Sequence, residues 1–596
     1  MVLDTLDGPF RHRYLTHEAL TRQLEAWART YPQLTRLQSI GTSPEGREIW
    51  VLAIGPEPER RRPAVWVDGN LHGVELAGSS VALAVAETAL AVHTNPTALP
   101  RHLPDHLLEF LRGVLFYICP RISPDGAEQV LRLSGFVRSA PRRTPHAPDL
   151  PYWRLQDMND DGRCRYLRVP DEAGDFIEST TCPGLMLPRR VDDPPPYWRL
   201  YPEGVIEHWD GETIPEPNWL LDTPDFNRNF PWSWQPEPEQ IGAGHYPGSE
   251  PETRAVIDFA IAHPNLYAWL NLHTFGGVFI RPLIDAPDSR MDQSDLALYR
   301  QLAAWAQDLV GYPTVSGYEE FTYEPETPLR GDLTDFAYHQ RGCVGLVCEL
   351  WDLFHRLGHP KPMRFVEHYT SFEREDMERL AQWDADHNQR RMFGAWQPLQ
   401  HPQLGAVEVG GLDPCIGLWN PPPEMLPALC DSVATYWLHV AALVPRLALE
   451  SVSTIALGND HWELKVTVAN RGYLPTHGVN AAARRPWNTG VEARASAEGG
   501  CQLLDPERAR QRLGHLDGWG RGLGEGAHMP WYQRSRGSSH RASVRWLIRG
   551  AGEVRLNIGG PRLGYLSRTI EIPGGAALPG HGSRPSRASR RRTQHR

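Results

Sequence analysis

The sequence has few cysteines and no excess of basic residues. Its 596 residues include only 8 cysteines, and none of them forms a CxxC pair. This excludes a disulfide scaffold and argues against a cysteine-based zinc finger. Lys and Arg number 61 against 72 Asp and Glu, a formal net charge of −11. Because nucleic acids call for clustered positive charge, this balance argues against a nucleic-acid partner.

Long apolar runs and several common catalytic motifs are also missing. The longest apolar stretch, Val433–Val444, is too short to span a bilayer, and no apolar leader follows the start. We therefore expect no membrane partner and a cytoplasmic location, with secretion left open because a misplaced start could hide a leader. HExxH, GxSxG, GxxxxGK[ST] and GxGxxG do not occur. The oligomeric state is left open.

What the sequence does contain is two kinds of periodic pattern. From about residue 15 to 400, β-branched runs alternate with helical patterns, which predicts an α/β sheet with covering helices. From about 449 the period changes to two, which predicts a β-sandwich. Helices are predicted over 76–92 and 424–445. Buried strands are predicted at Ala64–Asp68, Val114–Cys119, Tyr267–Leu272 and Val344–Cys348.

These patterns divide the chain into three predicted parts. They are a first domain over 1–446, a β-sandwich over 447–575 and a disordered basic tail over 576–596. Within the first domain, Pro, Asp, Arg and Trp replace the periodic pattern over about 142–222. A segment of that length predicts an insert without regular structure that covers a functional site.

Polar residues of a kind that bind zinc lie at the ends of three predicted strands. His72 and Glu75 follow the first strand, His273 follows the third, and Glu349 follows the fourth. Ligands gather at the carboxyl ends of strands in open α/β sheets. Two imidazoles and one carboxylate would leave a fourth position of zinc open, as in catalytic sites. The HxxE pair alone is weak evidence for a metal site, because about three His-x-x-acid matches are expected by chance in this sequence. The alternative interpretation of these residues is a polar loop before a helix.

Further motifs occur in a fixed order along the chain. They are HGVE at 72–75, SPDG at 123–126, DFNRNF at 225–230, LHT at 272–274 and DF at 335–336. With them, the chain resembles the zinc carboxypeptidases of the pancreatic carboxypeptidase A type, the peptidase M14 family, over about residues 15–400. The resemblance implies a mixed, mostly parallel sheet with flanking helices as the catalytic domain. The all-β sandwich resembles accessory domains of bacterial carboxypeptidases.

The resemblance also implies the catalytic centre. His72, Glu75 and His273 correspond to the family's zinc ligands, so one zinc ion per chain is expected. Glu349 corresponds to the glutamate that acts as general base. Such a carboxylate can take a proton from the attacking water and pass it to the leaving amine.

Four more residues correspond to the family's substrate contacts and their support. Arg138 corresponds to the arginine that polarises the substrate carbonyl; its alternative is a solvated arginine in a basic run. Asn227 and Arg228 correspond to the pair that holds the substrate's terminal carboxylate, which suits a planar guanidinium. Asp225 would orient a ligating histidine.

The chain departs from the family pattern at three places. Gly73 and Val74 stand where a second carboxylate-binding arginine is usual. Thr327 stands at the usual position of the capping tyrosine, and we assign that role to Tyr323. Thr334, at the position that sets side-chain preference, is neutral and disfavours a dedicated pocket for basic residues.

The insert contains a possible calcium turn. Asp157, Asn159 and Asp161 have the spacing of the start of an EF-hand loop, but Arg168 stands where that loop has Glu. The alternative is an Asx-rich turn without metal.

The predicted function is that of a zinc metallocarboxypeptidase that hydrolyses C-terminal peptide bonds of peptides or proteins. One alternative is a zinc-dependent amidohydrolase that acts on N-acyl amino acids or cell-wall peptides. A non-catalytic binding protein is the alternative from another class.

Overall fold

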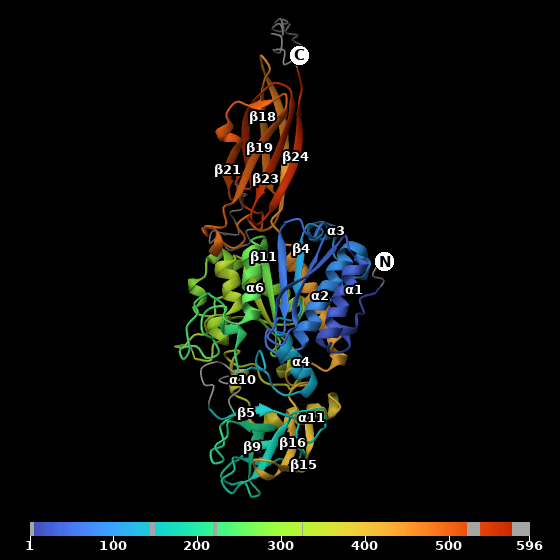
Figure 1. The fold of residues 1–596 in the computed structure, drawn as a ribbon, viewed down its shortest axis with the longest axis vertical. Coiled ribbons are helices and arrows are strands. Elements are labelled where there is room, and N and C mark those ends of the chain that lie inside the picture. Colours follow the sequence, from blue (N-terminus) through green and yellow to red (C-terminus); the bar gives the residue numbers. More distant parts are fainter. Residues whose placement is uncertain (1–4, 143–149, 218–222, 325, 521–536, 575–596) are drawn as a thin grey trace, which may run out of the picture.

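The computed structural model describes residues 5–142, 150–217, 223–324, 326–520 and 537–574. Three parts follow one another along the long axis of the molecule: a central α/β domain, a smaller lobe below it and a β-sandwich above it (Figure 1). The predicted tail over 576–596 lies outside the described residues. Among the helices of the described ranges, none is long and apolar enough to cross a membrane.

The central domain is built on an eight-stranded mixed sheet. Four neighbouring strands, β4, β3, β11 and β14, run parallel to one another, and antiparallel pairs join them to β2 on one side and β12 on the other. In sheet order the strands are β1 (Thr35–Thr42), β2 (Glu48–Ile54), β4 (Leu115–Cys119), β3 (Ala64–Gly69), β11 (Leu266–Thr274), β14 (Val344–Leu350), β12 (Val278–Arg281) and β13 (Thr314–Ser316). The four strands predicted from the sequence are β3, β4, β11 and β14. This confirms the predicted fold class.

Helices cover both faces of this sheet, which is why its central strands are mostly apolar. Along β3, Val65 and Val67 pack into the core on one face, while Trp66 packs into the core on the other. Strands buried on both faces have continuous apolar runs rather than alternation. The larger helices are α1 (His17–Thr30), α2 (Ala77–Thr94), α4 (Pro124–Leu133), α6 (Pro251–Ala262), α7 (Gln293–Leu309), α11 (Arg374–His387) and α12 (Leu426–Ala441).

Two of these helices were predicted from composition and lie against each other. Helix α2 is buried from Ala77 to Val92, because the sheet covers one side of it and α12 packs on it. The shorter helices are α3 (Asp105–Leu111), α8 (Leu333–Asp335), α9 (Leu353–Arg356) and α10 (Glu367–Thr370).

The lower lobe corrects the prediction of an insert without regular structure over 142–222. It contains β5 (Tyr152–Leu155), β6 (Tyr166–Pro170), β7 (Phe176–Glu178), β8 (Met186–Pro188), β9 (Trp198–Pro202) and β10 (Gly204–Glu207). Strands β15 (Phe393–His401) and β16 (Gly405–Leu412) form a hairpin, and β16 pairs with β6. The hairpin and the four strands β6, β7, β8 and β9 thus form one six-stranded sheet. Figure 1 shows these distant segments side by side. Strands of three to five residues are too short to give a periodic pattern, and β16, one of the two partners of β6, lies more than two hundred residues away.

The C-terminal part is a sandwich of two four-stranded antiparallel sheets. One sheet has the order β17–β18–β22–β20 and the other β21–β19–β23–β24, with an apolar core that contains Trp462 and Trp546. The strands are β17 (Leu447–Gly458), β18 (His461–Asn470), β19 (Val491–Gly499), β20 (Gln502–Leu503), β21 (Arg510–Gly514), β22 (Arg541–Arg549), β23 (Gly552–Gly560) and β24 (Gly564–Ile572). The predicted period of two is confirmed.

One buried arginine attaches the sandwich to the central domain. Arg562 is 1% exposed and donates hydrogen bonds to the backbone carbonyls of Leu266 and Arg341. Leu266 begins β11, and Arg341 lies three residues before β14. The sandwich therefore contacts the amino ends of the two strands that carry His273 and Glu349.

Candidate metal centre

The carboxyl ends of three adjacent parallel strands bring the predicted site residues together. His72 and Glu75 lie in the loop between β3 and α2, and His273 lies in β11 directly beside Glu349 of β14. A tight approach of backbone allows this loop to turn back: a Cβ atom at Gly69 would lie 2.4 Å from the carbonyl of Gly78. The sequence prediction of a shared edge is thus correct in its geometry.

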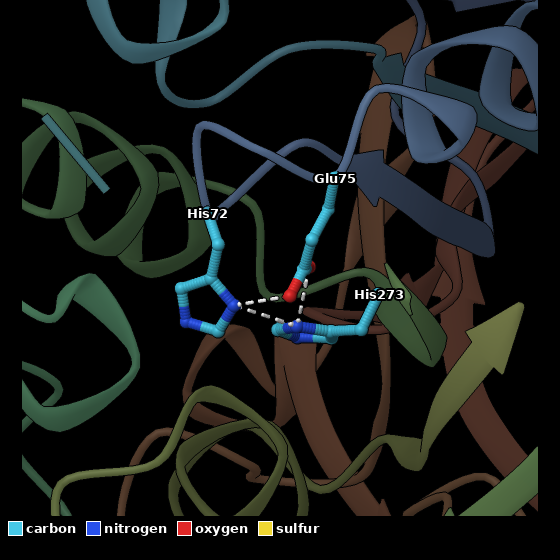
Figure 2. Close-up of side chains that lie close together, drawn as sticks. All are labelled: His72, Glu75 and His273. Atoms are coloured by element: carbon cyan, nitrogen blue, oxygen red, sulfur yellow. Dashed lines mark hydrogen bonds and ion pairs between the residues drawn. The ribbon is translucent and has the colours of Figure 1, made fainter. Parts of the chain in front are cut away.

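Three donor atoms converge at this edge (Figure 2). His72 Nδ1 lies 2.8 Å from Glu75 Oε1 and 3.2 Å from His273 Nδ1, and His273 Nδ1 lies 3.0 Å from Glu75 Oε2. Ligands about 2.0–2.1 Å from a tetrahedral zinc stand roughly 3.3 Å apart. The three side chains are at most 3% exposed. The residues present therefore fit a zinc ion with three protein ligands.

Each histidine is oriented through its other ring nitrogen. His72 Nε2 lies 3.2 Å from Asp225 Oδ1, and His273 Nε2 lies 2.5 Å from Asn271 Oδ1. Such partners fix the tautomer and present the facing nitrogen to a metal. Asp225 thus lies within hydrogen-bond distance of the His72 ring, and its role in orienting that histidine stays a prediction.

Sequence reasoning missed the support beneath His273. Asn271 donates to Asp68, whose carboxylate also accepts hydrogen bonds from the indoles of Trp66 and Trp269 at 2.6 and 2.7 Å. Burial raises the pKa of Asp68 to about 7, against the effect of these three donors. A polar residue inside an otherwise apolar strand was the available indication, because burying one without partners is costly.

Arg138 is held beside the same centre. Its Nε and Nη2 donate to Asp225 Oδ2 at 3.0 and 2.8 Å, so Asp225 bridges Arg138 and His72. Its backbone carbonyl accepts from Gly73 N at 2.7 Å, which ties it to the loop of the metal ligands. The alternative of a solvated arginine does not hold, since the side chain is only 17% exposed.

Glu349 is a partly buried carboxyl group beside the centre. Burial and the neighbouring Glu75 carboxylate raise its pKa well above the ordinary value, while Arg138 lowers it. A carboxyl group with a raised pKa in a cavity is suited to proton transfer near neutral pH.

A cavity of about 150 Å³ adjoins these residues. Its lining includes all three candidate metal ligands, Glu349, Arg138, Asn227 and Arg228. Asn227 Oδ1 accepts from Leu333 N at 2.9 Å, and Arg228 Nη1 donates to the Asn227 carbonyl at 2.8 Å. These contacts fix the pair at the cavity wall, where both can donate to an anionic group.

The base of the cavity carries unpartnered acceptors. Asp332 Oδ2, Thr334 Oγ1 and Asp335 Oδ1 are buried without a hydrogen bond, and all three residues line the cavity. The neutral Thr334 is thus flanked by two carboxyl groups. The sequence-based argument against a pocket for basic side chains considered Thr334 and overlooked Asp332. With Asp332 nearby, the neutrality of Thr334 no longer argues against such a pocket.

Two tyrosines line the cavity. Tyr323, the predicted capping residue, is 52% exposed at its rim. Tyr369, which sequence reasoning did not single out, donates a hydrogen bond to the Phe275 carbonyl. Thr327 is not part of the lining; its hydroxyl donates to Glu324.

The predicted calcium turn is not supported. Asp157 accepts hydrogen bonds from the backbone of Asn159, Asp161 and Gly162 at 2.7–3.3 Å, and Asp161 forms an ion pair with Arg165. Asn159 Oδ1 likewise accepts a hydrogen bond from the backbone of Asp161 at 3.2 Å, and Asp161 Oδ1 accepts one from the backbone of Arg163 at 3.0 Å. Because their oxygens are used by the turn itself, the segment is an Asx-rich turn.

Comparisons with known proteins found several carboxypeptidases that are similar to parts of this chain. Mouse carboxypeptidase M is 31% identical over 121 residues, which is 20% of this chain and 26% of that protein. The mouse carboxypeptidase N catalytic chain is 25% identical over 193 residues, 30% of this chain and 41% of that protein. The chain thus spans less than half the length of either relative. The solved structure of thrombin activatable fibrinolysis inhibitor aligns with a TM-score of 0.41 and 15% identity, over 73% of this chain and 75% of that one.

Two family profiles match the chain. Residues 446–571 match a domain of unknown function, DUF8731. Residues 20–366 match the profile described as zinc carboxypeptidase, Peptidase_M14. This match covers more than half of the chain, so the protein belongs to the zinc carboxypeptidase family, peptidase M14.

Proposed function

We propose that this protein is a zinc-dependent metallocarboxypeptidase that removes residues from the C-termini of peptides. The observation that carries the proposal is one cavity shared by three converging metal ligands, the partly buried Glu349 and the Asn227–Arg228 pair. A hydrolytic centre and a carboxylate-binding pair at such close range suit a scissile bond next to a free C-terminus.

The chemistry divides among the residues already placed. Zinc held by His72, Glu75 and His273 would act as a Lewis acid and lower the pKa of water to about 7. Glu349 would accept a proton from the attacking water and deliver it to the leaving amine. Arg138 would donate to the carbonyl oxygen as negative charge develops there, a contribution of roughly 3–4 kcal/mol for such a donor.

The remaining residues would select and hold the substrate. Arg228 and the amide of Asn227 would bind the terminal carboxylate, and Tyr323 at the rim would close over it. Asp332 at the cavity base would favour a positively charged C-terminal side chain, since a buried carboxylate gains most from an opposite charge.

A matched peptide panel tests the proposal. Peptides with a free C-terminus should lose their last residue, and the same peptides with an amidated C-terminus should not, because Arg228 then lacks its anionic partner. A chelator should abolish turnover, and added zinc should restore it. Equal cleavage of N-acyl amino acids or cell-wall peptides, with poor cleavage of ordinary peptides, would favour the amidohydrolase instead. A chain that binds zinc but cleaves nothing in the panel would contradict both.

A further inference from the structure

A second convergent group of side chains lies behind the cavity base. Asp285 follows β12 in the loop that leads to α7, Asp335 ends α8, and His339 lies one turn later in the helical segment Phe336–Gln340. One donor atom from each of these three residues lies within 4.8 Å of the others. In the described part of the chain, only this group and His72–Glu75–His273 have that property.

Asp335 lacks compensation for its charge. It is 1% exposed; Oδ2 accepts a hydrogen bond from Ile284 N at 3.1 Å, and Oδ1 is buried with no partner. Burial, Asp332 and Asp285 together raise its pKa well above the ordinary value. Arg228 favours the charged form of Asp332, whereas in the described part of the chain no positively charged side chain is among the main groups that act on the pKa of Asp335. A buried carboxylate so placed calls for a cation or a proton.

His339 is prepared as a neutral donor. Its ring stacks on Trp232 at a centroid distance of 4.0 Å and an angle of 15°, which fixes its plane, and its Nε2 is buried without a partner. Burial and then the charge of Arg485 lower its pKa to about 4. At neutral pH the imidazole is therefore uncharged, and a ring nitrogen retains a lone pair for a metal.

We propose that Asp285, Asp335 and His339 bind a second divalent transition-metal ion. Two carboxylate oxygens and one imidazole nitrogen are a donor set that suits Mn²⁺, Fe²⁺, Co²⁺ or Zn²⁺. Opposite ligands in an octahedral site stand roughly 4.2 Å apart, so a spread of up to 4.8 Å needs only a small inward movement of the half-buried Asp285. This proposal does not rest on the proposed function.

The ion would have a structural effect on the cavity. Asp335 lines the cavity base, and the Asp335 backbone amide donates to Asp332 Oδ1 at 2.9 Å. A bound cation would neutralise this region and join the loop after β12 to the turn that carries Asp332 and Thr334. It would act through position, without contact to the reacting bond.

Metal content decides the proposal. The purified full-length chain is stripped with a chelator, dialysed against Zn²⁺ or Mn²⁺, and analysed by mass spectrometry of the metal per chain. We expect two equivalents in the wild type with Zn²⁺, one in Asp285→Asn, one in His339→Gln and one in His72→Gln. Asp308→Asn, an exposed change on α7, serves as the matched control and should retain two.

Two outcomes would overturn the proposal. One is a single equivalent in the wild type that disappears in His72→Gln, which would leave the buried charge to a proton or to a substrate cation. The other is a second equivalent that persists in Asp285→Asn and His339→Gln. Because the ring nitrogen Nε2 of His339 is buried, circular dichroism of that variant is compared with the wild type, and the change at the half-buried Asp285 provides an independent test. Loss of the second equivalent alone leaves the proposed peptidase function untouched.

Discussion

Two regions of this molecule present oxygen and nitrogen donors in short sequence motifs, and only one of them forms a metal-binding geometry. In His72–Glu75–His273 the donor atoms face one another at 2.8–3.2 Å, and the support of Asp225 and Asn271 acts on the far ring nitrogens. In the turn at 157–162 the carboxylates accept backbone hydrogen bonds. The difference teaches that a ligand motif is meaningful when its donors are left unused by the chain's own backbone.

Removal of one converging donor should have the largest effect. Glu75→Gln or His273→Asn should lose the zinc bound at this centre and reduce peptidase activity to background, because two ligands do not hold a zinc ion against water. Metal analysis of the dialysed variants checks this. Asp161→Asn, which changes a donor of the turn, should retain both the zinc and the activity. If it lost either, the two regions would not differ as described.

The next largest effect is expected at Glu349, which adjoins the three metal ligands but is not one of them. Glu349→Gln should keep the bound zinc, while kcat falls by about 10²–10⁴, the range typical of a lost general base. Steady-state kinetics on a C-terminally free peptide, with metal content measured in parallel, provide the test. Zinc loss in this variant would make Glu349 a ligand and would enlarge the converging group to four.

Asp295 also accepts hydrogen bonds with its carboxylate oxygens, as Asp157 does in the turn, but Asp295 is buried. It accepts hydrogen bonds from the backbone of Asn480 and Ala481 and from Tyr338, and burial raises its pKa from 3.8 to about 6. The folded chain thus keeps the Asp295 carboxyl group protonated up to a higher pH than the unfolded chain does. The contribution of this group to the free energy of unfolding is present below about pH 4 and falls by up to about 3 kcal/mol as pH rises through 6.

Thermal unfolding of Asp295→Asn across this pH range is the measurement. The variant should gain on the wild type as pH rises from about 4 to above 6, since it has no carboxylate to ionise. Asp308→Asn on the same helix is exposed and should show no such pH dependence. A constant difference between Asp295→Asn and the wild type would contradict the assignment.

The smallest effect is expected at the turn itself. Millimolar calcium should leave the melting temperature of the wild type unchanged, because the Asp157 oxygens already accept backbone hydrogen bonds. Asp157→Ala should cost about 1–2 kcal/mol through those lost bonds, equally with and without calcium. A calcium-dependent rise in melting temperature that Asp157→Ala removes would place a cation in the turn after all.

The sequence was informative where local pattern decides structure. The runs that became β3, β4, β11 and β14 are almost continuously apolar, and polar residues after three of them indicated the centre. It was uninformative where partners lie far apart in the chain. The strands β6 to β9 are too short to recognise, and β16, with which β6 pairs, follows more than two hundred residues later.

Donor orientation was likewise hidden from the sequence. The spacing of Asp157, Asn159 and Asp161 is the same whether their oxygens point outward or back to the turn. Asp332 escaped attention because it caps a three-residue helix, α8, whose place at the cavity base depends on Asn227. Asn271 was visible as a polar residue in an apolar strand, but its partner Asp68 lies on another strand.

The attachment of the sandwich through Arg562 has a consequence for how the molecule could be anchored. The amino ends of β11 and β14 face the sandwich, and their carboxyl ends, with the cavity, face the other way. Gly564, where β24 begins, lies against the Arg61 carbonyl of the central domain, so β24 runs away from the cavity to the far tip of the sandwich. A support that gripped that tip would leave the cavity unobstructed, with the sandwich acting as a spacer of fixed length between the point of fixation and the site of reaction.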